Sequence, residues 1–192
     1  MAEHTSLFDQ FNSLDDSACE AQAIALGEQG EVGLQTLQQL LKSADADLRF
    51  WAVRGLWANG SPAAVARLIE TLEDENEMVR SGATLALGEL KAEAAIEALA
   101  RLVTTDDSAS GDHAADALAK IGPPSAQVLI EAMRSKQARV RRRAAKALIP
   151  VESKKAIPVL FEALDDESYT VRHYAENALA RMGVGQMVYF RV

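Results

Sequence analysis

Residues 140–151 read VRRRAAKALIPV, and a pattern of this kind recurs along the chain. Its other copies are LRFWAVRGLWANG (48–60), VRSGATLALGEL (79–90), SGDHAADALAKIG (110–122) and VRHYAENALARMG (171–183). Aligned on their first turn, the copies are separated by 31, 31, 30 and 31 residues; this column holds Arg49, Arg80, Gly111, Arg141 and Arg172. An independent column has the same steps; it holds Leu34, Val65, Ile96, Ala126 and Ile157. Two columns that keep one period indicate a repeat protein.

Each repeat contains two helical patterns. The first, as in PAAVARLIETLED (62–74), places its apolar residues on one stripe of a helix, and the second, as in MVRSGATLALGEL (78–90), does the same. Prolines stand at or near the starts of first helices, where a missing N–H costs little: Pro62, Pro123 and Pro158. Glycines follow the ends of second helices, where a left-handed cap favours them: Gly30, Gly60, Gly122 and Gly183.

Neither helix of a pair can bury its apolar stripe alone, whereas stacked pairs can. The sequence therefore predicts an all-α fold, an α-solenoid of about six helical pairs that forms a single repeat domain over residues 1–192. The expected repeats are 3–30, 31–60, 61–91, 92–122, 123–152 and 153–183, of which the first is a weaker copy. The C-terminal tail, 184–192, either caps the last pair, marks the cut edge of a longer protein, or binds a partner.

The consensus Asp/Glu-x-x-Val-Arg-x-x-Ala-x-x-Ala-Leu-x-x-Leu/Ile/Met-Gly resembles HEAT repeats. More narrowly, it is similar to the short bacterial type named after the phycocyanobilin lyases, and the resemblance covers nearly the whole chain. It implies a right-handed superhelix whose second helices line the concave face. It also implies that the repeated arginine ties neighbouring repeats together; this arginine is Arg49, Arg80, Arg141 or Arg172 in the respective repeats.

Composition excludes several classes of protein. The chain has 192 residues and a net charge of −8, and 48% of its residues are hydrophobic. No apolar stretch approaches the roughly 20 residues needed to cross a bilayer, and the N-terminus does not have the pattern of a signal peptide. The single cysteine, Cys19, has no partner for an internal disulfide. We therefore expect a cytoplasmic protein that does not bind a membrane.

The positions opposite the buried stripe of each second helix are expected to face the concave groove. In the early repeats these positions hold Phe50, Arg54, Trp57, Ser81, Leu85 and Gly88, and Trp51 lies beside them. The predicted partner contacts among them are Phe50, Trp51, Arg54, Trp57 and Leu85. Aromatic residues beside arginine are enriched at binding hot spots. The alternative is that the N-terminal helices cover and bury these side chains. Near the C-terminus the same positions predict a further contact through His173, Tyr174 and Asn177.

The basic repeat that begins at 138 raises a separate question in an acidic chain. Arg142 and Lys146 are expected on the groove, with Arg143 at its edge. Lys136 and Arg139 lie near the start of the same helix, where bases oppose the helix dipole, so they form a candidate anion site. A solvated basic face explains these residues as well. One basic repeat is a poor footprint for nucleic acid, so we expect no nucleic-acid binding.

The fourth repeat, 92–122, carries Asp112 and Asp116 on the groove, with His113 beside them. This trio suggests a metal site or an acid–base pair, but no second cluster completes a ligand set, and a solvated acidic face is favoured. We therefore predict no metal and no cofactor. Because Gly111 replaces the tying arginine in this repeat, we also expect the repeat to be the loosest.

These observations favour a protein–protein interaction scaffold or adaptor that binds a partner with acidic and apolar patches. No phosphate loop, Cys-x-x-Cys pair or nucleophile elbow is present, which argues against an enzyme without excluding one. The alternative, implied by the family resemblance, is a bilin lyase-type subunit that attaches or removes phycobilin chromophores on phycobiliproteins. Its partner would be a phycobiliprotein or a second lyase-type subunit.

Overall fold

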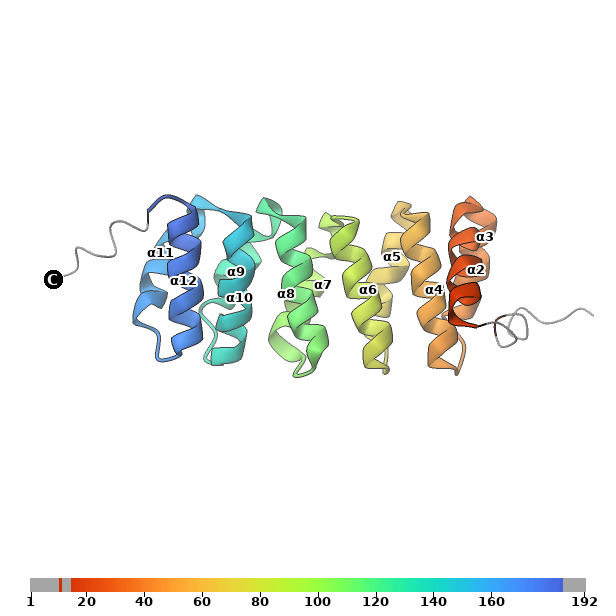
Figure 1. Ribbon diagram of the computed structural model, residues 1–192, viewed down its shortest axis with the longest axis horizontal. Coiled ribbons are helices and arrows are strands. Elements are labelled where there is room, and N and C mark those ends of the chain that lie inside the picture. The colour runs from red at the N-terminus through yellow and green to blue at the C-terminus, as the bar shows by residue number, and fades with distance from the viewer. Residues whose placement is uncertain (1–10, 12–14, 185–192) are drawn as a thin grey trace, which may run out of the picture. The chain divides into compact units, whose positions relative to one another are not determined.

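The computed structural model describes residue 11 and residues 15–184, and every regular element in that part of the chain is helical (Figure 1). The chain divides into two compact units, Met1–Leu90 and Lys91–Val192. Within the described residues, none of the helices combines the length and the apolar character needed to cross a membrane. The fold is an all-α solenoid in which each unit is built from helical pairs, as the sequence predicts.

The first unit contains five described helices: α2 (Asp16–Glu28), α3 (Gly30–Leu40), α4 (Ala46–Asn59), α5 (Pro62–Thr71) and α6 (Glu77–Glu89). Helices α3 and α4 form one pair, and α5 and α6 form the next. The second helices α4 and α6 pack side by side. Leucines of the first helices α3 and α5 and of the second helices α4 and α6 are fully buried, among them Leu37, Leu56, Leu68 and Leu87.

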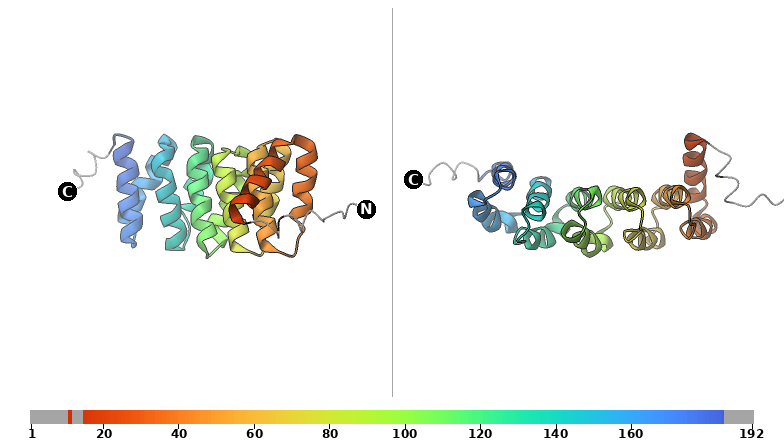
Figure 2. Two further views of the ribbon diagram at one scale, coloured as in Figure 1. Left: turned by 45° about the vertical axis from the view of Figure 1, so that its right-hand side comes forward. Right: turned by 90° about the horizontal axis from the view of Figure 1, so that it is seen from below.

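Helix α2 is the second helix of the expected repeat 3–30, and the first helix expected there falls largely outside the described residues. The right-hand view of Figure 2 shows α3 to α6 nearly end-on and α2 along its length, so α2 crosses the others steeply and stands out beyond the layer of α4 and α6. The crossing is close because glycines meet there. A Cβ on Gly55 would lie 2.7 Å from the carbonyl oxygen of Ala23, and a Cβ on Gly27 would collide with the carbonyl oxygen of Gly55.

The second unit repeats the paired arrangement with α7 (Ile96–Thr105), α8 (Ala109–Ile121), α9 (Ala126–Ala132), α10 (Ala138–Val151), α11 (Ile157–Glu162) and α12 (Tyr169–Arg181). Short 3-10 turns accompany the first helices at Glu93–Ala95, Pro123–Ser125, Lys154–Ala156 and Ala163–Asp165. The second helices α8, α10 and α12 are neighbours in that order. Leu99, Leu118, Leu129, Leu148 and Leu160 are fully buried.

The predicted prolines lie at the starts of first helices, and the predicted glycines lie at the ends of second helices. Pro62 occupies the first turn of α5, Pro123 opens the turn before α9, and Pro158 lies in the first turn of α11. The four predicted glycines all have positive φ angles, of 63°, 59°, 87° and 77° for Gly30, Gly60, Gly122 and Gly183. Positive φ strains residues with a Cβ, which explains glycine at these ends. The tail at 185–192 lies outside the described residues.

Candidate functional site

The repeated arginine makes the same contacts in both units. Arg49 is buried, and its guanidinium donates hydrogen bonds to both carboxylate oxygens of Asp74, at 2.7 and 2.9 Å, and to the carbonyls of Ser43 and Ala44. Arg49 thus holds the loop before its own helix and an acid in the next repeat. The hydrogen bond to Asp74 raises the pKa of Arg49.

Arg141 repeats this geometry in the second unit. It donates to Asp166 at 2.6 and 3.0 Å and to the carbonyls of Ser135 and Lys136 at 2.9 and 3.1 Å. Arg80 and Arg172 also bind the carbonyls five and six residues before them, at 2.6–3.1 Å. Arg49 and Arg141 thus join neighbouring repeats, as the family resemblance implies, whereas these contacts of Arg80 and Arg172 hold the loop of their own repeat.

Arg143 departs from the expected position at the edge of the groove. Only 2% of its surface is exposed, and its guanidinium donates to the carbonyls of Val103, Asp106 and Ser108 at 2.7–3.1 Å and to Asp112 Oδ2 at 3.1 Å. These groups belong to the end of α7, the loop after it, and α8. Arg143 is therefore a structural side chain rather than a partner contact, which corrects the expectation from the sequence.

The reason for this burial is the glycine at 111. A Cβ at Gly111 would collide with Nη1 of Arg143 and lie 2.6 Å from its Cζ, so the guanidinium occupies the space that a side chain at 111 would need. The repeat that lacks its own tying arginine receives one from the next helix. Asp106 O, which lies five residues before Gly111, is bound just as the other loops are bound by their own arginines. Arg143 therefore holds the loop of this repeat.

The remaining basic side chains of α10 pair with acids on α8 and in the loop before it. Arg142 Nη2 lies 2.7 Å from Asp112 Oδ1, and Lys146 Nζ lies 2.8 Å from Asp116 Oδ1. Arg139 forms an ion pair with Asp107. The expected acidic face of α8 is thus neutralised by the expected basic face of α10, and the two faces form one set of ion pairs between adjacent repeats.

Burial raises the pKa of Asp112, whereas its hydrogen bond with Arg143 and the charges of Arg143 and Arg142 lower it; the net pKa is below the ordinary value. The carboxylate therefore stays ionised and bound to both arginines. Within the described residues no group of three or more His, Cys, Asp or Glu side chains is arranged to hold a metal ion.

In the candidate anion site at Lys136 and Arg139, the guanidinium of Arg139 already binds other side chains. Arg139 donates to Gln137 Oε1 at 3.0 and 2.9 Å in addition to its ion pair with Asp107. Lys136 is exposed, and its carbonyl accepts a hydrogen bond from Arg141. The two side chains are not held together around a common centre by any of these contacts.

The aromatic residues of α4 form a continuous surface with α6, which we call the aromatic surface: Phe50, Trp51, Arg54, Trp57, Met78 and Leu85. Phe50 and Trp51 meet edge to face, with ring centroids 5.3 Å apart. The Arg54 guanidinium lies 4.6 Å above the Trp57 ring and forms an ion pair with Glu20 of α2. The aromatic side chains are half-buried, so α2 does not cover them completely.

Helix α6 extends this surface with two exposed apolar side chains. Met78 and Leu85 are 48% and 42% exposed, and their spacing of seven residues places them on one face of the helix. Gly82 lies between them, and a Cβ there would lie 3.2 Å from the Phe50 ring. The Phe50 ring therefore rests against α6 between Met78 and Leu85. The sequence predicts Leu85 but not Met78, although the spacing of seven residues was a signal for it.

The predicted residues of α12 also lie together. His173 stacks on Tyr169, with ring centroids 6.1 Å apart and an interplanar angle of 12°, and its other neighbour Tyr174 lies at 5.8 Å. Asn177 Nδ2 lies 3.1 Å from His173 Nε2. Tyr169, which is 71% exposed, was not expected here, and its place four residues before His173 was the available signal.

The sequence and the fold of this chain are similar to those of known repeat proteins. A protein-family model described as HEAT repeats matches residues 34–111 and 112–180. No curated protein sequence matches the chain. Among solved structures, an engineered protein is 25% identical, with a TM-score of 0.52, over 90% of this chain and 93% of that one.

Two further solved structures share the fold at lower identity. A designed armadillo repeat protein in complex with the peptide (KR)4 is 18% identical, with a TM-score of 0.54, over 94% of this chain and all of that one. The complex of CpcE and CpcF of phycocyanin lyase from Nostoc sp. PCC7120 is 23% identical, with a TM-score of 0.52, over 88% of this chain and 73% of that one.

Proposed function

This chain belongs to the HEAT-repeat family, and we propose that it is a protein-binding scaffold or adaptor whose main contact is the aromatic surface of α4 and α6. A repeat solenoid is compatible with this role because its stacked helices present an extended surface. The proposal is carried by one observation: the two packed helices α4 and α6 present three half-buried aromatic rings and two exposed apolar side chains, with the Phe50 ring against α6.

Such a surface favours binding because apolar side chains that remain exposed gain free energy when a partner removes them from water. Trp57 with Arg54 stacked above it has the composition of a binding hot spot. The α12 face, with His173, Tyr174 and Asn177, is a second candidate contact for the same partner or another one.

The ion pairs of α10 reduce the part that its basic side chains can play in binding a partner. Arg142 and Lys146 each already have an acidic partner in the chain, so an incoming acid would have to compete with Asp112 and Asp116. We therefore assign them a secondary place in the contact and leave Arg143 out of it. These side chains therefore give less reason to expect acidic patches on the partner. We still propose that the partner has an apolar patch.

Site-specific photo-crosslinking tests the proposal. A benzophenone amino acid is introduced at Leu85 and, as the matched control, at Val32, an equally apolar residue of α3 that is 68% exposed. Both proteins are irradiated in lysate of the source organism. We expect a protein that crosslinks at 85 and not at 32, and whose purified form binds the wild type more tightly than a Met78→Ser/Leu85→Ser variant. Identical products at both positions, or none at 85, would reject the proposal.

The bilin-lyase alternative remains a prediction from the sequence, since the likeness to the lyase complex concerns the fold. Titration with phycocyanobilin checks it in the same preparation. A change in the bilin absorbance on addition of the protein, together with transfer to a phycobiliprotein, would favour the lyase reading over the scaffold.

A further inference from the structure

The two units differ sharply in charge. Residues 1–90 contain 15 acidic and five basic residues, a net charge of −10, whereas residues 91–192 contain 13 acidic and 15 basic residues, a net charge of +2. The acidity of the protein therefore belongs to the unit that carries the aromatic surface. Resting on the proposed function, we propose that the aromatic surface binds a polypeptide segment that is both apolar and basic.

The few bases of the first unit do little to offset its acids at this surface. Arg49 is buried against Asp74, Arg54 forms an ion pair with Glu20, and Arg67 forms one with Glu70 at 2.8 Å. Lys42 lies elsewhere, on the rim of a hollow of about 370 Å³ between α3 and α5. An incoming basic group thus meets no unpaired cation among these four side chains at the aromatic surface.

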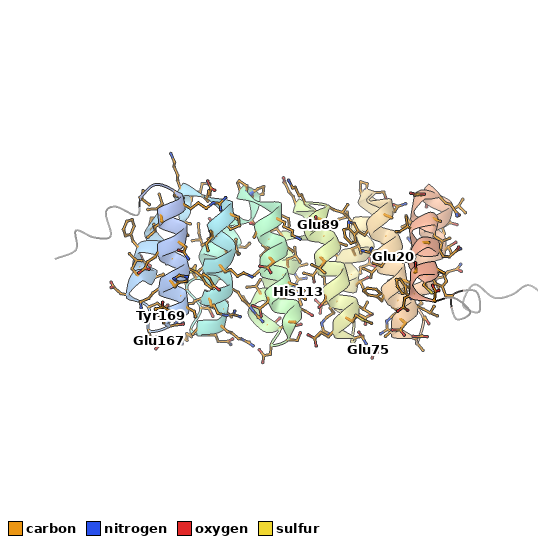
Figure 3. The ribbon with its side chains drawn as sticks, viewed as in Figure 1. Glu20, Glu75, Glu89, His113, Glu167 and Tyr169 are labelled. Atoms are coloured by element: carbon orange, nitrogen blue, oxygen red, sulfur yellow. The ribbon has the colours of Figure 1, made fainter. Side chains whose placement is uncertain are left out.

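Acidic side chains surround the apolar side chains on several sides. Asp47 is exposed one helical turn before Trp51, and Glu89 is exposed one turn after Leu85. In Figure 3, Glu20 lies on the side of α2, Glu75 at the lower end of the α4–α6 face and Glu89 at the upper end of α6. Glu20 is paired with Arg54, and Glu75 accepts a longer contact of 3.4 Å from Arg49, but the Glu75 side chain remains 87% exposed. The surface therefore has an apolar centre and an acidic rim.

This arrangement selects the chemistry of the partner. Lysine or arginine side chains that flank an apolar segment would meet the acidic rim while the apolar residues cover the aromatic centre. A segment with acidic flanks would place like charges together, which costs free energy and slows association. An anionic membrane surface is disfavoured for the same reason. The aromatic surface is therefore matched to a basic polypeptide and not to the acidic partner that the basic repeat suggests.

The chain provides its own probe for this interaction, because both of its tryptophans, Trp51 and Trp57, lie on α4 within the aromatic surface. The intrinsic fluorescence of the full-length protein is measured during titration with three synthetic peptides of equal length. One alternates leucine and lysine, the second replaces every lysine by glutamate, and the third replaces every leucine by serine.

We expect only the leucine–lysine peptide to shift the tryptophan emission, with an affinity that falls about tenfold or more between roughly 0.05 and 0.5 M NaCl. The variant Met78→Ser/Leu85→Ser should weaken that affinity at least about fivefold. The variant Asp47→Asn/Glu75→Gln should weaken it and reduce its dependence on salt. The control Glu31→Gln/Glu73→Gln removes the same charge from α3 and from the chain just after α5, and should leave the affinity unchanged.

Two results would overturn the inference. One is binding of the leucine–glutamate peptide as tightly as the leucine–lysine peptide; the other is an equal loss of affinity in the rim variant and its control. If Leu85 crosslinks to a specific protein but the leucine–lysine peptide does not bind, the proposed function stands and the inference fails. If the peptide binds but no protein crosslinks at Leu85, the proposed function fails instead. Far-UV circular dichroism of each variant verifies that its helices are intact.

Discussion

At the scale of single residues, Arg143 and Gly111 form a compensated pair. Four repeats have an arginine that binds the loop before its own helix, and the repeat with Gly111 lacks it. Arg143 enters from the following helix and binds three carbonyls of that region instead. A buried carbonyl without a hydrogen bond lowers the stability of the fold. Arg143 therefore stabilises the fold in a way that its neighbour Arg142 does not.

This difference predicts unequal costs for two adjacent alanine substitutions. Arg143→Ala should lower the free energy of unfolding by about 3 kcal/mol, because it leaves the carbonyls of Val103, Asp106 and Ser108 without this donor and removes one of the two arginines bound to Asp112. Arg142→Ala should cost at most about 1 kcal/mol, since its ion pair with Asp112 is partly exposed. Urea unfolding followed by far-UV circular dichroism measures both. Equal costs for the two variants would contradict the structural role of Arg143.

The close approach of Gly111 to Arg143 predicts that the two positions are coupled. Gly111→Ala should destabilise the wild type, because its Cβ would lie 2.6 Å from Arg143 Cζ and 2.7 Å from the Asp106 carbonyl oxygen. In an Arg143→Ala background the guanidinium is gone and only the carbonyl contact remains. The same substitution should therefore cost about 1 kcal/mol less there, which a double-mutant cycle on urea unfolding measures. Additive costs would show that the two residues do not share this space.

The ion pair between Arg141 and Asp166 predicts a dependence of stability on pH. The hydrogen bond from Arg141 lowers the pKa of Asp166 below its value in the unfolded chain, which is about 3.9. A carboxyl with a lowered pKa stabilises the fold fully above the unfolded value and loses that effect as the pH falls through the folded value. Asp166→Asn should therefore cost about 1.5–3 kcal/mol at neutral pH and much less near pH 2.

Urea unfolding at the two pH values tests this expectation. Asparagine retains an oxygen that can accept the hydrogen bond from the backbone N–H of Ser168, but its NH2 group replaces one of the two oxygens that accept from Arg141. The difference between the two pH values, rather than the cost at one pH, therefore reports the charge. A destabilisation that is the same at both pH values would mean that the negative charge of Asp166 does not contribute to stability.

At the scale of elements, α8 and α10 are joined by charges as well as by apolar packing. Asp107, Asp112 and Asp116 face Arg139, Arg142 and Lys146 across adjacent repeats. Exposed ion pairs of this kind contribute little to stability one by one, but they remove the charge contrast that the sequence displays. Reversal of charge at Arg142 or Lys146 would therefore disturb the packing of two helices as well as any surface for a partner.

Exchange of the charges of one pair tests this contact. Lys146→Glu alone should lower the free energy of unfolding by about 0.5–1 kcal/mol, because it places glutamate beside Asp116 where both side chains are a little over 40% exposed. Asp116→Lys/Lys146→Glu should recover most of that loss at low salt. Thermal unfolding in low and high NaCl measures the effect. If the double variant is no more stable than the sum of the single ones predicts, the two side chains do not interact.

At the scale of the whole molecule, charge is unevenly divided along the chain, and the cluster of basic residues on α10 is engaged with acids. Residues 1–90 have a net charge of −10, and the most basic helix, α10, has ion pairs to α8 through Arg142, Arg143 and Lys146 and to the loop before α8 through Arg139. Affinity for nucleic acid depends mainly on the number of phosphates that free bases neutralise. The distribution of charge therefore disfavours a nucleic-acid partner.

We accordingly expect no measurable binding of a fluorescein-labelled DNA duplex or single-stranded RNA at about 0.15 M NaCl, the ionic strength at which the Debye length is about 8 Å. Fluorescence anisotropy measures it, with the leucine–lysine peptide as the positive control for an active protein. Saturable binding of either nucleic acid at low micromolar concentration would contradict this prediction, and its loss in Lys136→Gln/Arg139→Gln would then assign the contact to the start of α10.

Much of the fold could be predicted because it depends on local rules. The period of about 31 residues, the two helices in each repeat and the buried columns follow from the 3.6-residue periodicity of each helix. The helix ends follow from proline and glycine at fixed places, since these residues have special backbone preferences. The steep angle of α2 was not predicted, because it depends on which backbones approach one another at Gly27 and Gly55.

The candidate site was only partly predictable for a related reason. Phe50, Trp51, Arg54, Trp57 and Leu85 were identified from their place on the helix, and the structure groups them with Met78. The ion pairs between α8 and α10 had a signal in the sequence, since Asp112 and Arg142, and likewise Asp116 and Lys146, occupy the same column one repeat apart. That signal has meaning only when the distance between adjacent second helices is known.

The sequence by itself determined the repeat, the helical pairs and the face of each helix, because these properties come from residue spacing and backbone preference. The tertiary structure alone decided the fate of the charged side chains. Whether Arg143 faces a partner or fills the space at Gly111, and whether Arg142 and Lys146 are free or paired, depends on the helix that stacks beside α10. Charge is therefore read correctly only after the neighbour is known, since an opposite charge within about 4 Å changes what a side chain can bind.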